Sequence, residues 1–263
     1  MNKHAKVISV YGSYLHGAGV STMALSLAIV MQQITDKKVL VINLDNERSL
    51  LEKFIERDVE IKHSIDDIRI YEEKLKPEVI ENHVDMINDN LFLISKSKTG
   101  KTSLKFVDKL IDIAKKKFDF IIIDTGNNPD DNLLRNADIS IYVSEYNELT
   151  LDNTVKTIKD DKTVIVFNKF PNEYSSNLTT INFKKNHNIK NQVFTVNYDE
   201  SVFTEACEKR NIYSFLIKNL NSKNIFINDI FKITVHAAEH SKVKVQKNYE
   251  KRGLIGGWNL KIF

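Results

Sequence analysis

Short hydrophobic runs recur along the chain, and amphipathic or polar stretches long enough for helices separate them. The runs with the strongest strand character lie at residues 6–11, 38–43, 91–95, 118–123, 139–143, 163–167 and 192–196. Runs that are apolar at nearly every position, such as 38–43, are typical of strands buried on both faces of a sheet. Strands that alternate with helices indicate βα units. The pattern therefore predicts an α/β fold with a mostly parallel sheet flanked by helices.

Helical patterns fill most of the stretches between these runs. Apolar residues at helical spacing or in continuous blocks predict helices over residues 23–31, 104–114, 148–159 and 201–210. Residues 50–88 are polar, and we expect broken helices there with a boundary at Pro77. Glycine and proline are scarce, which argues against a flexible hinge. We therefore predict one domain over residues 1–240 and a tail over residues 241–263.

Composition narrows the class of protein without naming a function. The 263 residues are 42% hydrophobic and 28% charged, which is ordinary for a globular α/β domain, and the net charge of +3 is too small to indicate nucleic-acid binding. Cys207 is the single cysteine, so no internal disulfide can form. The chain shows no signal-peptide profile and no apolar run near the ~20 residues of a membrane span. We expect a cytoplasmic protein.

The most informative segment lies between the first strand and the first helix. Residues 12–22 read Gly-Ser-Tyr-Leu-His-Gly-Ala-Gly-Val-Ser-Thr. A glycine-rich loop between a strand and a helix is typical of a phosphate-binding P-loop, in which backbone N–H groups face the phosphates. Ser21 stands where a P-loop hydroxyl binds Mg²⁺, whereas Val20 stands where the P-loop lysine is expected. The predicted nucleotide-binding residues are Gly17, Ala18, Gly19, Val20, Ser21 and Thr22.

The missing lysine leaves two interpretations of this loop open. A charge-assisted contact to a phosphate contributes roughly 1.5–3 kcal/mol, so its loss weakens nucleotide binding ten- to hundred-fold unless another group replaces it. The alternative is a tight turn that binds nothing. Three polar residues that follow other predicted strands favour a site: Asp124 as a Mg²⁺ ligand, Asp45 to orient an attacking water, and Asn168 to contact the base.

The order of these motifs resembles the ParA/MinD family of deviant Walker A ATPases. The resemblance runs from Lys6 to Leu216 and includes Val-Ile-Asn-Leu-Asp, Ile-Ile-Ile-Asp-Thr and Val-Phe-Asn-Lys. It implies a doubly wound, twisted, mostly parallel P-loop NTPase sheet, ATP or ADP with Mg²⁺ as ligands, and a homodimer that positions cellular cargo.

Three positions depart from the family pattern. The family's signature lysine falls on Leu15, its P-loop lysine falls on Val20, and the first of its two switch aspartates is Asn43. Asp45, the second switch aspartate, remains. The loss of both lysines implies that ATP hydrolysis is weak or absent. The ending Gly-Val-Ser-Thr is similar to the atypical TadZ/CpaE branch, whose members localise pilus machinery.

The sequence therefore predicts a nucleotide-binding protein with a degenerate P-loop that positions or scaffolds a pilus, secretion or conjugation assembly through protein partners. The alternative is an active ParA-type ATPase for plasmid or mobile-element partitioning, with a lysine supplied from elsewhere. The tail carries basic and aromatic residues, a composition suited to peripheral contact with the inner face of a membrane. A solvated or dimer-packing tail is the competing interpretation, and nucleic-acid binding is the least favoured.

Overall fold

The computed structural model describes residues 5–12, 17–45, 49–127, 130–158, 160–171, 180–241 and 245. Within these ranges, eight strands form one sheet in the order β3-β4-β2-β5-β1-β6-β7-β8. Neighbouring strands are parallel except for β3 and β4, which are antiparallel. The strands are β1 (Lys6–Gly12), β2 (Val39–Asn43), β3 (Asp85–Asn88), β4 (Leu91–Ile94), β5 (Phe120–Asp124), β6 (Ile139–Glu145), β7 (Thr163–Phe170) and β8 (Val193–Asn197).

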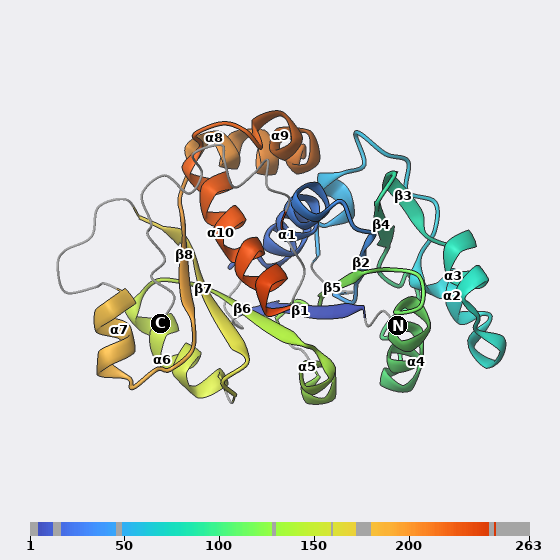
Figure 1. Cartoon of the computed structure of the whole chain (residues 1–263), viewed down its shortest axis with the longest axis horizontal. Coiled ribbons are helices and arrows are strands. Elements are labelled where there is room, and N and C mark those ends of the chain that lie inside the picture. Colours follow the sequence, from blue (N-terminus) through green and yellow to red (C-terminus); the bar gives the residue numbers. More distant parts are fainter. Residues whose placement is uncertain are drawn as a thin grey trace.

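Helices cover both faces of the sheet (Figure 1). On one face lie α1 (Val20–Thr35), α9 (Ile212–Asn219) and α10 (Ile225–His240). The other face carries α4 (Leu104–Ala114), α5 (Asp131–Asn136), α6 (Glu148–Thr157) and α7 (Thr180–Asn186). Shorter elements are η1 (Glu52–Phe54), α2 (Ile65–Arg69), η2 (Glu72–Lys74), α3 (Pro77–Asn82), α8 (Glu200–Val202) and the π-helical η3 (Phe203–Glu208).

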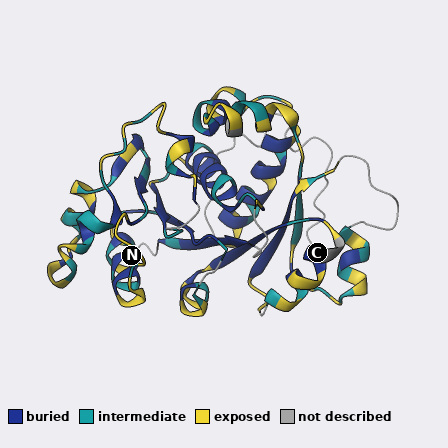
Figure 2. Ribbon diagram, turned by 180° about the vertical axis from the view of Figure 1, so that it is seen from behind, coloured by how far each residue is buried: buried dark blue, intermediate teal, exposed yellow. Residues whose placement is uncertain are grey.

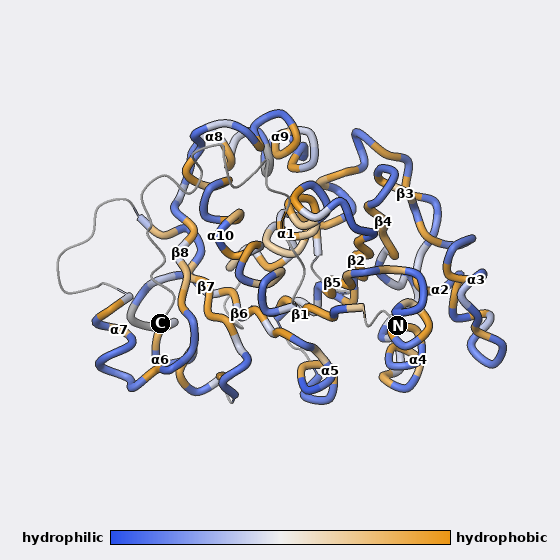
Figure 3. Tube along the Cα trace, viewed as in Figure 1, coloured by the Kyte–Doolittle hydropathy of each residue, from blue (hydrophilic) through white to orange (hydrophobic). Residues whose placement is uncertain are grey.

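Alternate side chains of each central strand bury against opposite helix layers. Ile8 and Val10 of β1 belong to the core beneath α1 and α10, whereas Val7 packs in the core beneath α4. The central strands and α1 are buried almost throughout, and exposed residues gather on the outer helices (Figure 2). Hydrophobic residues follow the same division along the trace (Figure 3). Burial on both faces explains why these strands are continuous apolar runs.

The predicted fold class is confirmed, and the differences lie at the edges of the sheet. The antiparallel strand β3 was not predicted, because only Asp85 and Ile87 of its four residues are buried and Asp85 is polar. The Asp85 carboxylate accepts hydrogen bonds from the N–H groups of Lys62 and His63, which explains an acidic residue inside a strand. Pro77 begins α3, as expected from its fixed φ.

Two predicted boundaries were wrong. Strand β7 continues beyond Phe167 to Phe170, so Asn168 lies inside the strand and not after it. The helix predicted over 201–210 is divided into α8 and the π-helical η3, and it ends at Glu208.

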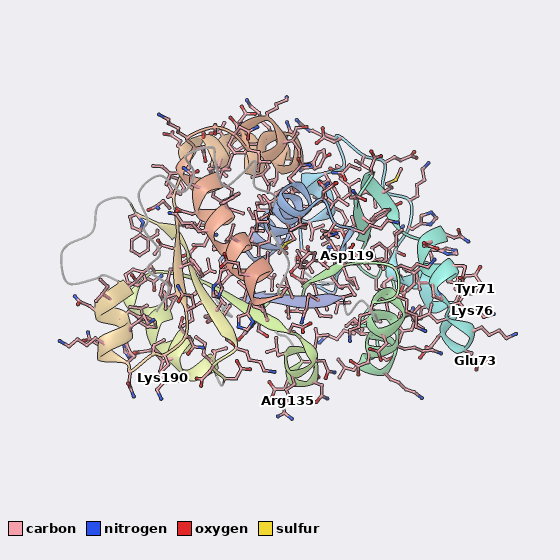
Figure 4. All side chains as sticks on the ribbon, viewed as in Figure 1. Tyr71, Glu73, Lys76, Asp119, Arg135 and Lys190 are labelled. Carbon is pink, nitrogen blue, oxygen red and sulfur yellow. The ribbon has the colours of Figure 1, made fainter. Side chains whose placement is uncertain are left out.

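The segment that holds η2 and α3 lies at the periphery of the molecule, and the predicted tail is described only in part. Side chains of Tyr71, Glu73 and Lys76 project at the outer edge of the molecule, around η2 and α3 (Figure 4). Of the predicted tail, only Ser241 and Val245 fall within the described residues, and Val245 packs against the core beneath α10. The domain boundary at residue 240 stays a prediction. Among the described helices, none has both the length and the hydropathy to cross a membrane.

Candidate nucleotide-binding site

Gly17, Ala18 and Gly19 are the described part of the glycine loop that leads from β1 into α1, and β1 lies between β5 and β6 in the sheet. Gly17 and Gly19 both adopt left-handed backbone conformations, with φ of 87° and 90°. Gly19 precedes α1 and supplies no side-chain cap, so the first N–H groups of the helix have no capping side chain. This combination is the anion-binding geometry expected of a P-loop. Leu15, the position of the family's signature lysine, lies outside the described residues.

Asn168 holds the loop against the sheet. Its Nδ2 donates a hydrogen bond of 2.8 Å to the carbonyl oxygen of Ala18. A Cβ added to Gly19 would lie only 2.4 Å from that same nitrogen, so the position requires glycine for space as well as for its φ. The structure therefore brings Asn168 to the phosphate loop, and its predicted contact with a nucleotide base remains a prediction.

A pocket of about 560 Å³ opens above the loop. All six predicted nucleotide-binding loop residues, from Gly17 to Thr22, line it, together with Asp45 and Asn168. Its remaining wall is mostly apolar and includes Leu50, Phe54, Tyr198, Val202, Phe203 and Phe226. A concave site with an anion-binding loop and an aromatic wall suits a ligand that has both phosphates and a flat ring.

Asp124 lies just beneath the pocket at the end of β5 and is fully buried. Its carboxylate accepts hydrogen bonds of 3.1 Å from the N–H of Gly126 and from Ser49 Oγ. The hydroxyl of Ser21 lies 3.0 Å from Ser49 Oγ, so both serines adjoin the carboxylate. Burial raises the pKa of Asp124 to about 6, although hydrogen bonds from Ser21, Gly126 and Ser49 oppose the shift.

The replacement of an aspartate by Asn43 has a local explanation. Asn43 Nδ2 donates hydrogen bonds to Ser49 Oγ at 2.9 Å and to Glu52 Oε1 at 2.8 Å. The same Glu52 oxygen accepts the N–H of Lys96 at 2.9 Å. Because a carboxylate already stands opposite position 43, an amide that can donate suits this position and a second carboxylate does not. Sequence reasoning missed Ser49 and Glu52, which belong to no recognised motif.

Asp45 follows β2 and reaches the pocket, as the sequence predicts. Its N–H donates to Asn43 Oδ1 at 3.1 Å. A Cβ on Gly126 would lie 2.6 Å from Asp45 Cγ, so the glycine after the Asp124-Thr125 pair lets this side chain approach β5 closely. Gly126 also has a left-handed φ of 66°. The structure therefore brings Asp45, Asp124 and Ser21 to the same edge of the sheet.

The donor set fits Mg²⁺ bound together with phosphates. Ser21 offers a hydroxyl oxygen and Asp124 a carboxylate, and Mg²⁺ prefers few protein oxygens completed by water and phosphate. Across the described ranges, no group of three or more His, Cys, Asp or Glu side chains could hold a metal ion. Ser21 and Asp124 would supply two oxygen ligands to Mg²⁺, and water or phosphate oxygens would complete its octahedral shell.

The fold and the loop together assign the chain to the P-loop proteins with the ParA/MinD architecture. Solved structures agree: a ParA family ATPase from Chlorobium tepidum TLS superposes with a TM-score of 0.72 at 19% identity, covering 89% of this chain and 99% of that one. The MinC:MinD cell division complex of Aquifex aeolicus gives 0.70 at 14% identity, covering 89% and 96%. MinD with Mg-ADP from Pyrococcus horikoshii OT3 gives 0.67 at 15% identity, covering 90% and 97%.

Sequence comparison narrows this assignment. The family model described as ATPase MipZ matches residues 7–169, more than half of the chain, and the chain therefore belongs to this family of ParA/MinD-like ATPases. No curated protein sequence matches the chain. The resemblance to the ParA/MinD family is confirmed, and the narrower TadZ/CpaE resemblance stays a prediction.

Proposed function

We propose that the chain binds ADP or ATP with Mg²⁺ at the glycine loop and uses the bound nucleotide to control its assembly with partners. The observation that carries the proposal is the loop itself. Gly17 and Gly19 hold left-handed conformations at an uncapped helix start and line one pocket with Asp45 and Asn168. A turn with no ligand would need no convergence of polar groups from β2, β5 and β7 upon two left-handed glycines.

Each residue has a defined part in this proposal. Backbone N–H groups from Gly17 to Thr22 bind the phosphates, and Asn168 orients the loop and contacts the base. Ser21 and Asp124 hold Mg²⁺, which when bound offsets phosphate charge. The Mg-ADP in the similar MinD from Pyrococcus horikoshii supports this choice of ligand.

Hydrolysis is weak or absent in this proposal, because the P-loop is degenerate. Val20 is 5% exposed and belongs to the hydrophobic core. Its Cγ2 lies 2.3 Å from where a Cβ on Gly12 would stand, so the side chain packs under the loop. Position 20 is therefore a packing position here and supplies no charge to the phosphates. Asp45 orients the attacking water in whatever turnover survives.

The cellular role that we infer is positioning or scaffolding of a pilus, secretion or conjugation assembly by a homodimer. The MinC:MinD complex gives a precedent of the same fold assembled with a protein partner. We expect the basic tail to add peripheral contact with a membrane, and nucleic acid to be a weaker partner. The second candidate function is an active ParA-type partitioning ATPase. The position of Asp45 in the pocket, where it could orient an attacking water, supports this alternative.

Calorimetric titration of the full chain with Mg-ADP tests nucleotide binding. Gly19→Ala abolishes binding in our proposal, because the new Cβ meets Asn168 and the left-handed φ is strained. Gly100→Ala is the matched control: Gly100 also has a positive φ, of 121°, but an added Cβ meets no atom within 4 Å. Absence of binding by the unaltered chain would overturn the proposal. Phosphate release that Asp45→Ala abolishes would favour the active ATPase instead.

A further inference from the structure

We propose that Lys169, at the end of β7, supplies the positive charge for the nucleotide phosphates that Val20 and Leu15 do not. This inference rests on the nucleotide-binding function proposed above. It gives a role to a residue that lies in the Val-Phe-Asn-Lys segment but that neither the P-loop motif nor the family resemblance assigns to the phosphates. It makes Lys169 a phosphate-binding residue delivered from a strand instead of from the loop.

The position of the ammonium group is the first support. Lys169 Nζ lies 3.7 Å from where a side-chain Cβ on Gly17 would stand, so it lies directly over the phosphate loop. Lys169 lines the same pocket as Gly17 to Thr22. Among the described residues that line this pocket, it is the one with a positive charge. Phosphates bound by the loop would therefore come within reach of this lysine.

The backbone of β7 is irregular where it presents Lys169. The pairing of β7 with β8 shifts register between Phe167 and Phe170, which marks a bulge or irregularity in the strand. Lys169 has a φ of 53°, a left-handed conformation that a lysine rarely adopts. Such irregularities change the direction of a side chain and gather at functional sites. Here, the irregularity lets Asn168 bind the loop while Lys169 reaches the pocket.

Glu145 of β6 pairs with this lysine in the absence of ligand. The Glu145 carboxylate lies 2.8 Å from Lys169 Nζ, and the two side chains are 37% and 43% exposed. An ion pair this exposed contributes little free energy, so a phosphate competes with Glu145 for the ammonium without a large penalty. The glutamate also places a negative charge near the phosphates. Its removal should therefore strengthen nucleotide binding, whereas removal of the lysine should weaken it.

The opposite changes in nucleotide affinity expected for the lysine and glutamate variants provide the test. Calorimetric titrations with Mg-ADP compare the unaltered full chain with Lys169→Met, Lys169→Arg and Glu145→Gln. We expect Lys169→Met to weaken binding about tenfold or more, Lys169→Arg to retain most of it, and Glu145→Gln to tighten it. The control is Lys115→Met, which removes a similarly exposed lysine whose partner is Asp112 on α4. It should leave the affinity unchanged. Thermal midpoints without nucleotide check that each variant folds.

The outcomes separate this inference from the proposed function. Lys169→Met and Glu145→Gln break the same ion pair, so a purely structural pair would move the affinity in one direction for both. That result, or unchanged affinity in Lys169→Met, would overturn the role of Lys169 and leave the nucleotide site intact. Failure of the unaltered chain to bind Mg-ADP would overturn the proposed function itself. Opposite shifts, with arginine rescue, would support Lys169 as the replacement cation.

Discussion

The two flanks of the glycine loop are built from different kinds of polar contact. On the β2–β5 flank, Asn43, Ser49 and Asp124 are buried and joined by direct hydrogen bonds. On the β6–β7 flank, Asn168 is also buried and bonded to Ala18, but Lys169 and Glu145 form a half-exposed ion pair. Buried networks fix geometry because each member depends on the others, whereas exposed pairs rearrange with little change in free energy. The first flank is thus preformed, and the second can adapt to a ligand.

The largest expected effect comes from placing a second carboxylate in the buried flank. Asn43→Asp, which restores the family's residue, should destabilise the fold by about 3 to 5 kcal/mol, because the new carboxylate faces Glu52 Oε1 with no proton to donate. Urea denaturation at pH 8 measures the loss. The double variant Asn43→Asp with Glu52→Gln should recover most of it, since the glutamine can donate to the new carboxylate. If the double variant is as unstable as the single one, this account of Asn43 is wrong.

The second-largest expected effect on stability comes from the buried charge of Asp124. Its folded pKa of about 6 lies above the ordinary value of 3.8, so the folded state binds the proton more tightly than the unfolded chain. The contribution of Asp124 to stability should therefore be largest at low pH and be lost as the pH rises from about 4 through 6. Asp124→Asn should raise the free energy of unfolding at pH 8 by up to about 3 kcal/mol and lower the affinity for Mg-ADP.

Denaturation of both proteins in EDTA, at pH 4.5 and pH 8, measures this difference. The advantage of Asp124→Asn should shrink at the lower pH, where Asp124 is largely protonated in the folded state. An advantage that is equal at both pH values would show that the asparagine acts through packing and not through charge.

A smaller effect is expected from Ser49→Ala. The Ser49 hydroxyl accepts from Asn43 and from the N–H of Leu51, and it donates to Asp124. Its removal leaves buried polar groups without that partner and should destabilise the fold by about 2 kcal/mol. Ser49→Thr keeps the hydroxyl and is the matched control. Equal midpoints for the alanine variant and the unaltered chain in urea would refute a linking role for Ser49.

The smallest effect on stability is expected on the β6–β7 flank, from the loss of the Lys169–Glu145 ion pair. Lys169→Met should change the free energy of unfolding without nucleotide by no more than about 0.5 kcal/mol, because the pair with Glu145 is half exposed. Thermal or urea unfolding of the ligand-free protein measures it. A loss comparable to that of Ser49→Ala would mean that the two flanks are equally rigid, which contradicts the comparison.

The sequence predicts which strands and loop residues form the site better than it predicts which side chains are in contact there. The strands, the glycine loop, Asp45 and Asp124 follow from local pattern, since an apolar run or a glycine spacing is a property of neighbouring residues. Ser49 and Lys169 were not predicted as site residues, because their partners Asp124 and Glu145 become neighbours only through strand order. Glu52 is close to Asn43 in sequence, but no motif links the two residues. Strand β3 was not predicted because its local pattern is weak: the strand is short, half exposed and acidic at its first residue.

The position of β1 in the middle of the sheet has a consequence for folding kinetics. Lys6 pairs with Phe120, and Ile8 pairs with both Ile122 and Ile139, so the first strand has to wait for partners far along the chain. During synthesis, β1 and the apolar helix α1 leave the ribosome well before β5 exists. Such nonlocal pairing slows folding and leaves apolar segments exposed in the meantime. We therefore expect the amino-terminal half to expose its apolar segments until β5 and β6 can pair with β1.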